Sequence, residues 1–342
     1  MPKTMIAGAG IAGGYLWRLL VRRGMNHKDV EIVDPHPRTR CGISPCGFAV
    51  TRQFFSLCQE VGLDPEKYIL ASPEVGYVNE VKFNVKGYVF SIDKPAFIKD
   101  LLEGATVNPS PSDILKERVI DATGIARAYI GRYESDVLYP CIQRKVEFPQ
   151  TPVLRECSHR VGYSWVIPLE GNKAHVGIGS VTYDSEAMTK VVEGLAQGAK
   201  TICGCHGLIR GTGPIVPLVR GNLWAVGEAA GLVDPLSGAG IVPAMVSVKL
   251  LVAHWDDPNG YEAAIIKKYG WFRKTAQLVQ AWQDKGFLNI NKLLGLWRNY
   301  ADFVGLNIGI FSLVRANLIH NAFRIALRAP SVRKSLRTNQ RS

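Results

Sequence analysis

The sequence of 342 residues contains no run of about 18 uncharged apolar residues, the length that a helix needs to cross a bilayer. Its seven cysteines are odd in number and scattered, which excludes the disulfide framework of a small secreted protein. The segment Cys203–His206, CGCH, has no second CxxC or HxxxH pair to complete a metal site. No signal-peptide pattern precedes the first apolar segment, TMIAGAG. These absences predict a folded cytoplasmic protein without a bound metal.

Acidic residues are missing from one end of the chain. From Phe303 onward there is no Asp or Glu, whereas seven Lys and Arg residues lie there and supply more than half of the net charge of +12. Such a segment binds nucleic acid or an anionic membrane surface. No nucleic-acid-binding module accompanies it, so we expect no nucleic acid partner.

The same end has a helical pattern of polar residues. These recur at helical spacing between apolar residues and are Asn317, His320, Asn321, Arg324 and Arg328. Two interpretations remain open. One is an interfacial helix on the inner face of the cell membrane, with its arginines toward anionic headgroups. The other is a helix packed on the core with a solvated basic end.

The chain begins with the pattern of a dinucleotide-binding turn. Gly8, Gly10 and Gly13 have GxGxxG spacing, directly after an apolar strand and at the start of a helical segment. The glycines permit a tight turn, close approach to a pyrophosphate and close helix packing, while the helix N-terminus offers free amides. Asp34 ends the next strand, where a carboxylate accepts ribose hydroxyls. Glu31 on that strand is the fallback ligand, and a purely structural turn is the alternative.

Two later segments also run from a strand into a turn of small residues. VIDATG places Asp121 and Gly124 at a strand end, and LWAVGEAAGLVDPLSGAGI places Gly227 and Glu228 at another. A carboxylate at Glu228 can accept a ribitol hydroxyl, and the small loop after it leaves room for a flavin beside the backbone. The positive end of the next helix stabilises negative charge on a reduced isoalloxazine. The candidate contacts in this loop are Asp234, Gly238, Gly240 and Ile241.

The segments between these turns have strand patterns. YVNEVKF and GYVFSID predict an antiparallel pair with Gly87 in its turn, and EGNK predicts a hairpin between YSWVIPL and AHVGIGSV. The sequence therefore predicts an α/β fold with three regions. A Rossmann-type FAD-binding domain is assembled from residues 1–50, 85–135 and 215–255. Residues 51–84 and 136–214 form an antiparallel β-rich substrate domain, and residues 256–342 form a helical, basic, membrane-associated region.

The three strand-to-turn segments resemble those of flavoproteins of the para-hydroxybenzoate hydroxylase type, although Gly-Glu replaces the usual Gly-Asp at Glu228. Two further matches resemble the geranylgeranyl reductases. SPCGF contains their Pro-Cys-Gly segment, with Cys46. YSWVIPLEGNKAHVGIG resembles their Tyr-x-Trp-x-Phe-Pro and Gly-x-Gly signature, with Ile167 in place of phenylalanine. The matching positions in this signature are Tyr163, Trp165, Pro168, Gly177 and Gly179. The resemblance covers residues 3–255 and is poor between Leu102 and Val119.

The resemblance implies FAD-dependent reduction of isolated C=C bonds in the geranylgeranyl chains of archaeal-type ether lipids or their precursors. Tyr163 and Trp165 lie two apart on a strand, so they face the same side and could wall an isoprenoid tunnel; ordinary core aromatics are the alternative. Cys46, which the resemblance places near the flavin, and Tyr163 are the candidate catalytic residues. The partners implied are a prenylated lipid, an anionic membrane surface and an electron donor such as ferredoxin or NAD(P)H. The alternatives are a flavin-dependent aromatic hydroxylase or halogenase and a non-catalytic prenyl-lipid binding protein.

Overall fold

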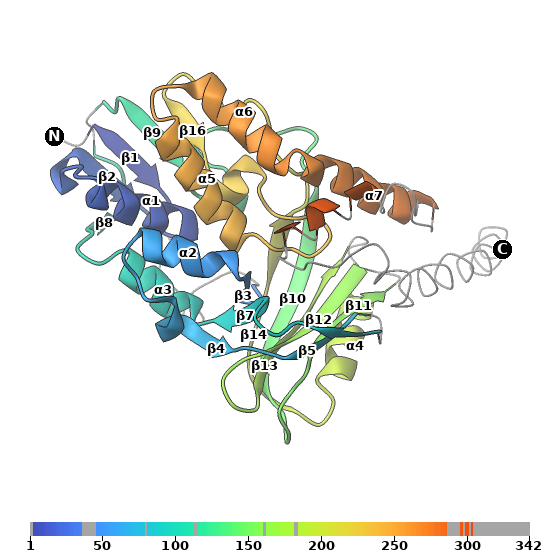
Figure 1. The fold of residues 1–342 in the computed structure, drawn as a ribbon. Helices are drawn as coiled ribbons and strands as arrows, with labels where there is room; N and C mark the ends of the chain where they lie inside the picture. Colours follow the sequence, from blue (N-terminus) through green and yellow to red (C-terminus); the bar gives the residue numbers. More distant parts are fainter. Residues whose placement is uncertain are drawn as a thin grey trace.

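One half of the fold, assembled from segments along the whole chain, is built on a six-stranded sheet (Figure 1). The computed structural model describes residues 3–35, 46–78, 81–112, 115–159, 162–180, 184–285, 295–296, 298–300 and 302–303. The sheet order is β15 (Val219–Arg220), β16 (Leu223–Ala225), β9 (Arg118–Asp121), β1 (Thr4–Ala7), β2 (Val30–Val33) and β8 (Val107–Asn108). All of its pairs are parallel except β15 with β16. The strands β16, β9, β1 and β2 therefore end at one edge of the sheet.

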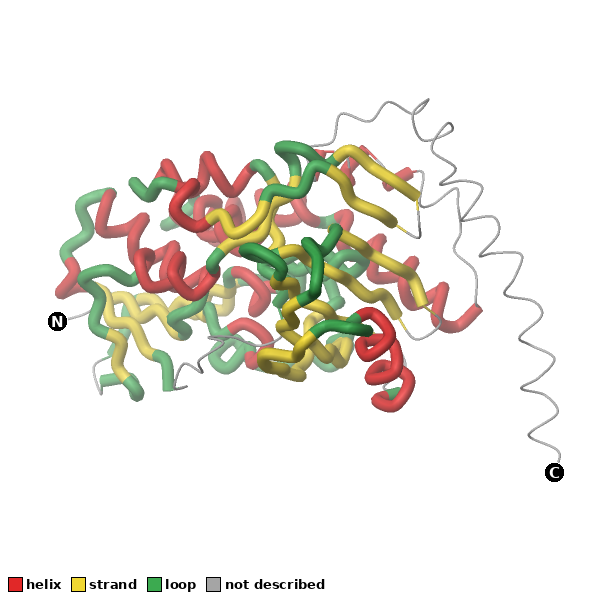
Figure 2. The backbone as a smooth tube through the Cα atoms, turned by 90° about the horizontal axis from the view of Figure 1, so that it is seen from below, coloured by secondary structure: helices red, strands yellow, loops and turns green. Residues whose placement is uncertain are grey.

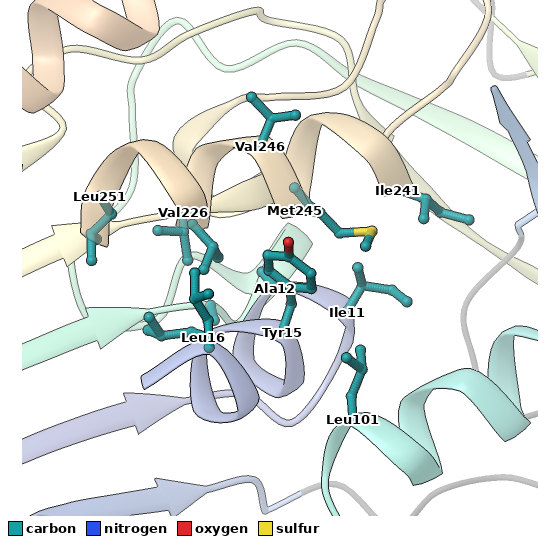
Figure 3. Close-up of a cluster of buried hydrophobic side chains, with 14 of the residues drawn as sticks. Ile11, Ala12, Tyr15, Leu16, Leu101, Val226, Ile241, Met245, Val246 and Leu251 are labelled. Carbon is teal, nitrogen blue, oxygen red and sulfur yellow. The ribbon is translucent and has the colours of Figure 1, made fainter. Parts of the chain in front are cut away.

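The helices of this half surround a common core. Helix α1 (Ile11–Arg22) contacts both α5 (Ile241–Ala253) and α3 (Lys94–Leu101). Figure 3 shows Ile11, Ala12 and Tyr15 of α1 facing Met245 of α5. Nine residues of α1 are buried, because the helix has neighbours on more than one side. The remaining helices here are α2 (Gln53–Glu60), α6 (Pro258–Tyr269) and α7 (Trp271–Lys285), with short 3₁₀ turns at His27–Asp29 and Pro65–Tyr68.

The second large sheet has seven strands. Its order is β14 (Lys200–Arg210), β10 (Leu138–Glu147), β13 (Lys173–Ser180), β12 (Gly162–Pro168), β11 (Leu154–His159), β5 (Val75–Val78) and β6 (Val81–Asn84). All pairs are antiparallel except β11 with β5. Helix α4 (Ser185–Leu195) packs Met188 and Val192 on one face, against Val146 and Val176. In Figure 2 the N-terminus lies at one side of the molecule and the long strands extend toward the other.

The opposite face of this sheet carries the Tyr163–Trp165 pair, together with Cys141 and Ile167. The predicted hairpin between YSWVIPL and AHVGIGSV is confirmed, since β12 pairs with β13 through the turn at residues 169–172. The predicted combination of a Rossmann-type parallel sheet and an antiparallel sheet is also confirmed. The domain limits given above remain a prediction.

One predicted strand pair is wrong. YVNEVKF does not pair with GYVFSID; it forms the hairpin of β5 and β6 by itself. The strand β7 (Val89–Ile92) instead lies in a separate three-stranded sheet between β3 (Ala49–Thr51) and β4 (Ile69–Ala71). Gly87 does occupy a turn, with φ of 74°. That turn redirects the chain between two sheets, because the apolar side chains of Phe90 and Ile92 are buried in the core that also contains α1 and α5.

In the part of the chain that the structure describes, no helix combines the length and the hydropathy that crossing a membrane requires. The polar positions of the predicted interfacial helix, Asn317 to Arg328, lie outside the described residues. The proposed membrane attachment of this region therefore remains a prediction.

Candidate functional site

The turns that follow β1, β9 and β16 lie in contact with one another. A Cβ atom at Gly8, where φ is 103°, would lie 2.4 Å from the carbonyl oxygen of Ala122 in the second turn. Gly124 faces the Glu228 carboxylate, and Gly227 packs against Ala12 of α1. Three segments that are about 100 residues apart in the chain thus form one corner at the carboxyl edge of the parallel sheet.

The first turn has the features of an anion-binding site. At Gly13 a Cβ would collide with the Gly8 carbonyl oxygen, so close packing requires glycine there. At Gly10 a Cβ would meet no atom of the described residues within 4 Å, which leaves space for a ligand at the start of α1. The N-cap residue of this helix is Gly10, which has no side chain to cap it, so the first amides of α1 can bind an anionic group. Asp34 accepts a hydrogen bond from the Ala9 amide at 2.9 Å and is partly exposed.

Glu31, the fallback ribose ligand, has a structural role instead. Its carboxylate forms a 2.6 Å ion pair with Lys116, and both side chains are about 5% exposed or less. It also accepts hydrogen bonds from the amide and hydroxyl of Ser112. Burial alone would raise the pKa of Glu31, but the bonds from Lys116 and Ser112 outweigh it and lower the pKa. This carboxylate joins β2 to the segment before β9.

Asp121 shapes the second turn from within. It is fully buried, and its two oxygens accept hydrogen bonds from Thr123, from the Tyr129 amide and from the Ile130 amide at 2.6–3.1 Å. These donors use the oxygens that a ligand would need. Among the residues of this turn, Gly124, with φ of 63°, is the position where a ligand would meet backbone alone.

Arg210, at the end of β14, connects the second and third turns. Its guanidinium binds Asp136 through Nε at 2.9 Å and donates to the carbonyl oxygens of Gly124, Ile125 and Glu228 at 2.9–3.2 Å. Its backbone amide donates to the Glu228 carboxylate at 3.0 Å. The Arg210 side chain is only 3% exposed. One side chain of the antiparallel sheet therefore fixes two turns of the parallel sheet.

The third turn ends in a second helix without a side-chain cap. The Gly227 amide donates to the Ser247 hydroxyl at 2.9 Å, which holds the turn against α5. Glu228 is partly exposed, and burial raises its pKa, although the amide and charge of Arg210 oppose this. Asp234 is buried and accepts hydrogen bonds from Ser237 and from the Tyr300 hydroxyl. Gly240 precedes Ile241, the first residue of α5, and provides no side-chain cap.

The aromatic and glycine positions of the β12–β13 signature are cross-strand partners. Trp165 lies opposite Gly177, and Tyr163 lies opposite Gly179. A Cβ at Gly177 would lie 2.4 Å from the Trp165 ring, and one at Gly179 would lie 3.2 Å from the Tyr163 ring. Each ring therefore lies across the glycine of the neighbouring strand. The two rings are 5.5 Å apart and form one continuous aromatic surface.

The segment after residue 45 packs on this surface. The Trp165 indole donates to Gln143 Oε1 at 3.1 Å, and Gln143 Nε2 donates to the carbonyl oxygen of Cys46 at 3.1 Å. Gly47 lies on Ile167, whose Cδ1 would be 2.2 Å from a Cβ at that position. The structure thus brings the Cys46 segment and the aromatic signature together. Pro168 is not part of this wall; its carbonyl accepts the Ser91 hydroxyl at 2.6 Å and ties β12 to β7.

A pocket lies where the aromatic surface meets the third turn. Its walls come from β10, β12, β13, β14 and the loop before α5, and its lining includes Cys141, Tyr163, Gly179, Ile209, Asp234 and Gly238. The Tyr163 hydroxyl reaches this loop, because a Cβ at Gly238 would lie 2.3 Å from it. Burial and the nearby thiol and carboxyl groups raise the pKa of Tyr163 well above its usual value, so the phenol stays protonated at neutral pH.

The fold and this arrangement can be compared with known proteins. The chain is 27% identical to digeranylgeranylglycerophospholipid reductase 1 of Methanococcoides burtonii over 228 residues. The aligned region is 59% of this chain and 54% of that reductase. The chain is thus similar in sequence to a geranylgeranyl reductase over somewhat more than half of its length. The match spans about half the length of this curated relative. A family model for tryptophan halogenases matches residues 119–278.

Solved structures show the same fold. A geranylgeranyl bacteriochlorophyll reductase-like protein of Thermoplasma acidophilum covers 92% of this chain and 95% of its own, with a TM-score of 0.69 and 16% identity. The alignment with a triple mutant of a flavin-dependent brominase covers 95% of this chain and 100% of the brominase chain, with a TM-score of 0.65 and 12% identity. The fold is therefore one that geranylgeranyl reductases share with flavin-dependent halogenases.

Several residues of the site carry no motif that would identify them in the sequence. Arg210 and Gln143 belong to strands with ordinary alternation, and their roles depend on partners about 70–100 residues away. Ser247 lies inside an apolar helix, where a lone serine is unremarkable. One feature of the sequence could have indicated Arg210 and Gln143. Both are polar residues at strand positions where the alternation predicts an inward-facing, buried side chain.

Proposed function

We propose that this protein is an FAD-dependent oxidoreductase that reduces isolated C=C bonds in geranylgeranyl chains of archaeal-type ether lipids or their precursors. The observation that carries the proposal is the Tyr163–Trp165 surface, which lies across two glycines and meets the glycine-rich loop before α5 at one pocket. Rigid aromatic area suits an apolar isoprenoid chain with few polar groups. The homology to a digeranylgeranylglycerophospholipid reductase supports this substrate class.

The residues present fit FAD. The space at Gly10 and the N-terminus of α1, which has no side-chain cap at Gly10, suit a pyrophosphate, and the partly exposed Asp34 directly after β2 would bind ribose. Glu228 is half-buried and directed at Gly124, where it would accept a ribitol hydroxyl. In this proposal the FAD-binding residues are Gly8, Gly10, Gly13, Asp34, Gly124, Gly227, Glu228, Gly238, Gly240 and Ile241. Asp121 and Asp234 would act by fixing the turns that carry these contacts.

When bound, reduced FAD would supply a hydride to one carbon of the alkene. The residues of the chain would hold the prenyl chain along Tyr163 and Trp165, exclude water and stabilise the positive charge that develops on the other carbon. Cys46 would border the reacting region, because Gln143 holds its carbonyl oxygen. Gly177 and Gly179 would position the two aromatic rings, and Pro168 would anchor the end of β12 through the Ser91 hydroxyl.

The electron donor, ferredoxin, NAD(P)H or another reductant, would act from outside the sites described above. A prenylated lipid must be drawn from a membrane, which fits peripheral attachment on the inner face of the cell membrane through the basic residues after Phe303. Within this proposal, residues 1–50, 85–135 and 215–255 would form the FAD-binding domain.

A spectroscopic assay tests the proposal. The purified protein is loaded with FAD, reduced with dithionite without air and mixed with a geranylgeranylated ether phospholipid. We expect flavin reoxidation together with loss of alkene signals in the lipid. A protein that binds the lipid but neither binds FAD nor reduces alkene would refute the enzyme and leave a lipid-binding function.

The variant Trp165→Ala sharpens this assay. The Trp165 side chain is only 5% exposed. Removing its indole deletes most of the aromatic surface without altering the glycine turns. We expect alkene reduction to fall at least tenfold, while the FAD content stays equal to that of the wild type. Loss of FAD from this variant would place Trp165 in the cofactor site and contradict the assignment.

A flavin-dependent halogenase is the second candidate, because the tryptophan halogenase family model matches residues 119–278. Tryptophan, chloride or bromide, reduced FAD and oxygen form the corresponding assay. A halogenated product from the wild type, together with no reoxidation by the prenyl lipid in the absence of air, would favour this candidate over the reductase.

A further inference from the structure

Glu156 lies on the substrate-facing side of the antiparallel sheet, although no sequence motif includes it. In the β11–β12 register it stands directly opposite Trp165. Directly opposed side chains of an antiparallel pair share a face, and Tyr163 lies on that face two residues from Trp165. The Glu156 carboxyl group therefore belongs to the aromatic surface that we assign to the prenyl chain.

The surroundings of Glu156 and Asp234 differ in hydrogen bonding. Asp234 accepts bonds from the Ser237 amide at 3.0 Å, the Ser237 hydroxyl at 2.5 Å and the Tyr300 hydroxyl at 2.6 Å. Such donors stabilise an ionised carboxylate. Among the described residues, none donates a hydrogen bond to Glu156 or forms an ion pair with it. Burial raises the pKa of both acids, but only at Asp234 do hydrogen-bond donors oppose the rise. Of these two acidic groups near Tyr163, Glu156 is thus the one whose charged form no described donor stabilises.

Asp234 is the charged group that acts on Glu156. It comes from the loop before α5, whereas Tyr163 of β12 and Tyr300 of the helical residues 298–300 have strongly raised pKa values and stay neutral. On the other side, β5 contributes Val78, which has no charge. Burial, and then the negative charge of Asp234, raise the pKa of Glu156 to about 7. A carboxyl group of this acidity can donate a proton at neutral pH and recover one from water.

We propose that Glu156 is the general acid that protonates the alkene, an assignment that rests on the proposed reductase function. The π bond of the alkene breaks and two C–H bonds form, one with the hydride supplied by reduced FAD and one with the proton of Glu156. The O–H bond of Glu156 breaks and leaves a carboxylate, which takes a proton from solvent before the next turnover. The phenol of Tyr163, with its strongly raised pKa, orients the chain and keeps its proton.

The test compares Glu156→Gln with the matched control Glu147→Gln, an exposed position at the end of β10 in the same sheet. Each full-length variant is loaded with FAD, reduced without air and mixed with geranylgeranylated ether phospholipid from pH 5.5 to 9. We expect wild-type reoxidation to be constant below about pH 7 and to fall above it, because the acid must be protonated. Glu156→Gln should be about 100-fold slower and independent of pH, whereas Glu147→Gln should match the wild type.

A second readout does not depend on turnover. In protein labelled with ¹³C at the glutamate carboxyl groups, the resonance that disappears in Glu156→Gln should titrate near pH 7 rather than at the ordinary value of 4.5. Glu156→Asp should restore part of the rate and its pH dependence. A titration near 4.5, or a Glu156→Gln rate within about twofold of the wild type, would overturn the general-acid assignment alone. A wild type that binds FAD but does not reduce the lipid would overturn the proposed function and the assignment together.

Discussion

Gly177 shows how a single missing side chain shapes the pocket. The Trp165 ring occupies the space where a Cβ would stand, 2.4 Å away. The Gly-x-Gly spacing is thus the partner of Tyr-x-Trp, because antiparallel register places residues 163 and 165 opposite residues 179 and 177. The sequence pattern identified these four residues, but their pairing required the register.

The variant Gly177→Ala should displace the Trp165 ring. Overpacking of this kind costs about 1–3 kcal/mol, so we expect a lower free energy of unfolding and a shifted tryptophan emission spectrum. Prenyl lipid reduction should fall while FAD remains bound. The control is Gly194→Ala in α4, where a Cβ meets nothing within 4 Å and alanine favours the helix. Equal effects of both variants on stability and emission would contradict a specific clash.

Arg210 belongs to no recognisable sequence motif. Its ion pair with Asp136 is almost completely buried, with side-chain exposures of 3% and 14%. Arg210→Ala should lower the free energy of unfolding by about 3–5 kcal/mol, because Asp136 keeps its charge and loses its partner. It should also weaken FAD binding, since the turns at Gly124 and Glu228 lose their common donor.

The exposed pair of Arg144 and Glu193 supplies the control. Arg144→Ala should change the free energy of unfolding by no more than about 1 kcal/mol and leave FAD affinity unchanged. Chemical denaturation and FAD titration measure both quantities. An Arg210→Ala variant with wild-type FAD affinity would show that the turns hold their shape without this side chain.

At the scale of elements, the sequence predicted best where local chemistry determines structure. The strand–turn–helix of residues 4–22 is forced by Gly8 and Gly13, whose neighbours leave no room for a Cβ. The start of helix α3 at Lys94 is also set by a local contact, because the Asp93 carboxylate accepts a hydrogen bond from the Ala96 amide. The partner of a strand is a nonlocal property, and the predicted pairing around Gly87 failed for that reason.

His175, which joins β13 to the segment after Cys46, predicts that the free energy of unfolding depends on pH. His175 is buried, its ring packs edge-on against Phe48 at 4.6 Å, and Nδ1 lies 3.4 Å from the Gly47 carbonyl oxygen. Burial lowers the pKa of His175 to about 4, with Lys94 and Lys145 acting in the same direction and the Gly47 contact opposing them.

Since the unfolded chain binds a proton near pH 6.5 and the native ring does not, stability falls as the pH drops through this range. Between pH 7 and pH 5 we expect His175 to account for a loss of about 2 kcal/mol. Urea unfolding at both pH values should show this loss in the wild type and in the exposed-site control His206→Gln, but not in His175→Gln. An unchanged pH dependence in His175→Gln would show that the native ring accepts a proton.

At the scale of the whole molecule, the site lies where the two large sheets meet. The parallel sheet contributes the three turns, and the antiparallel sheet contributes Arg210 and the Tyr163–Trp165 surface. The turns of the parallel sheet and the β12–β13 hairpin of the antiparallel sheet could be predicted from local motifs. Their junction could not, because it depends on buried hydrogen bonds such as the one between Gln143 and the Cys46 carbonyl oxygen, which no periodicity reveals.

Cofactor binding should therefore stabilise the molecule as a whole. A ligand that binds only the folded state adds about 2.7 kcal/mol at 100 times its Kd, so FAD should raise the melting temperature. Gly10→Ala separates this effect from folding, because its Cβ would enter open space where we place the pyrophosphate. We expect the apo variant to unfold within about 1 kcal/mol of the wild type and to lose most of the FAD-induced shift.

Gly8→Ala provides the contrasting case for the same thermal measurement. Its Cβ would lie 2.4 Å from the Ala122 carbonyl oxygen at a φ of 103°, so the apo protein itself should be destabilised. If Gly10→Ala kept the full FAD-induced shift while Gly8→Ala lost stability, the turn would be structural and the cofactor would lie elsewhere. The opposite result would place the pyrophosphate at the start of α1, since only an added ligand could meet a side chain that touches no protein atom.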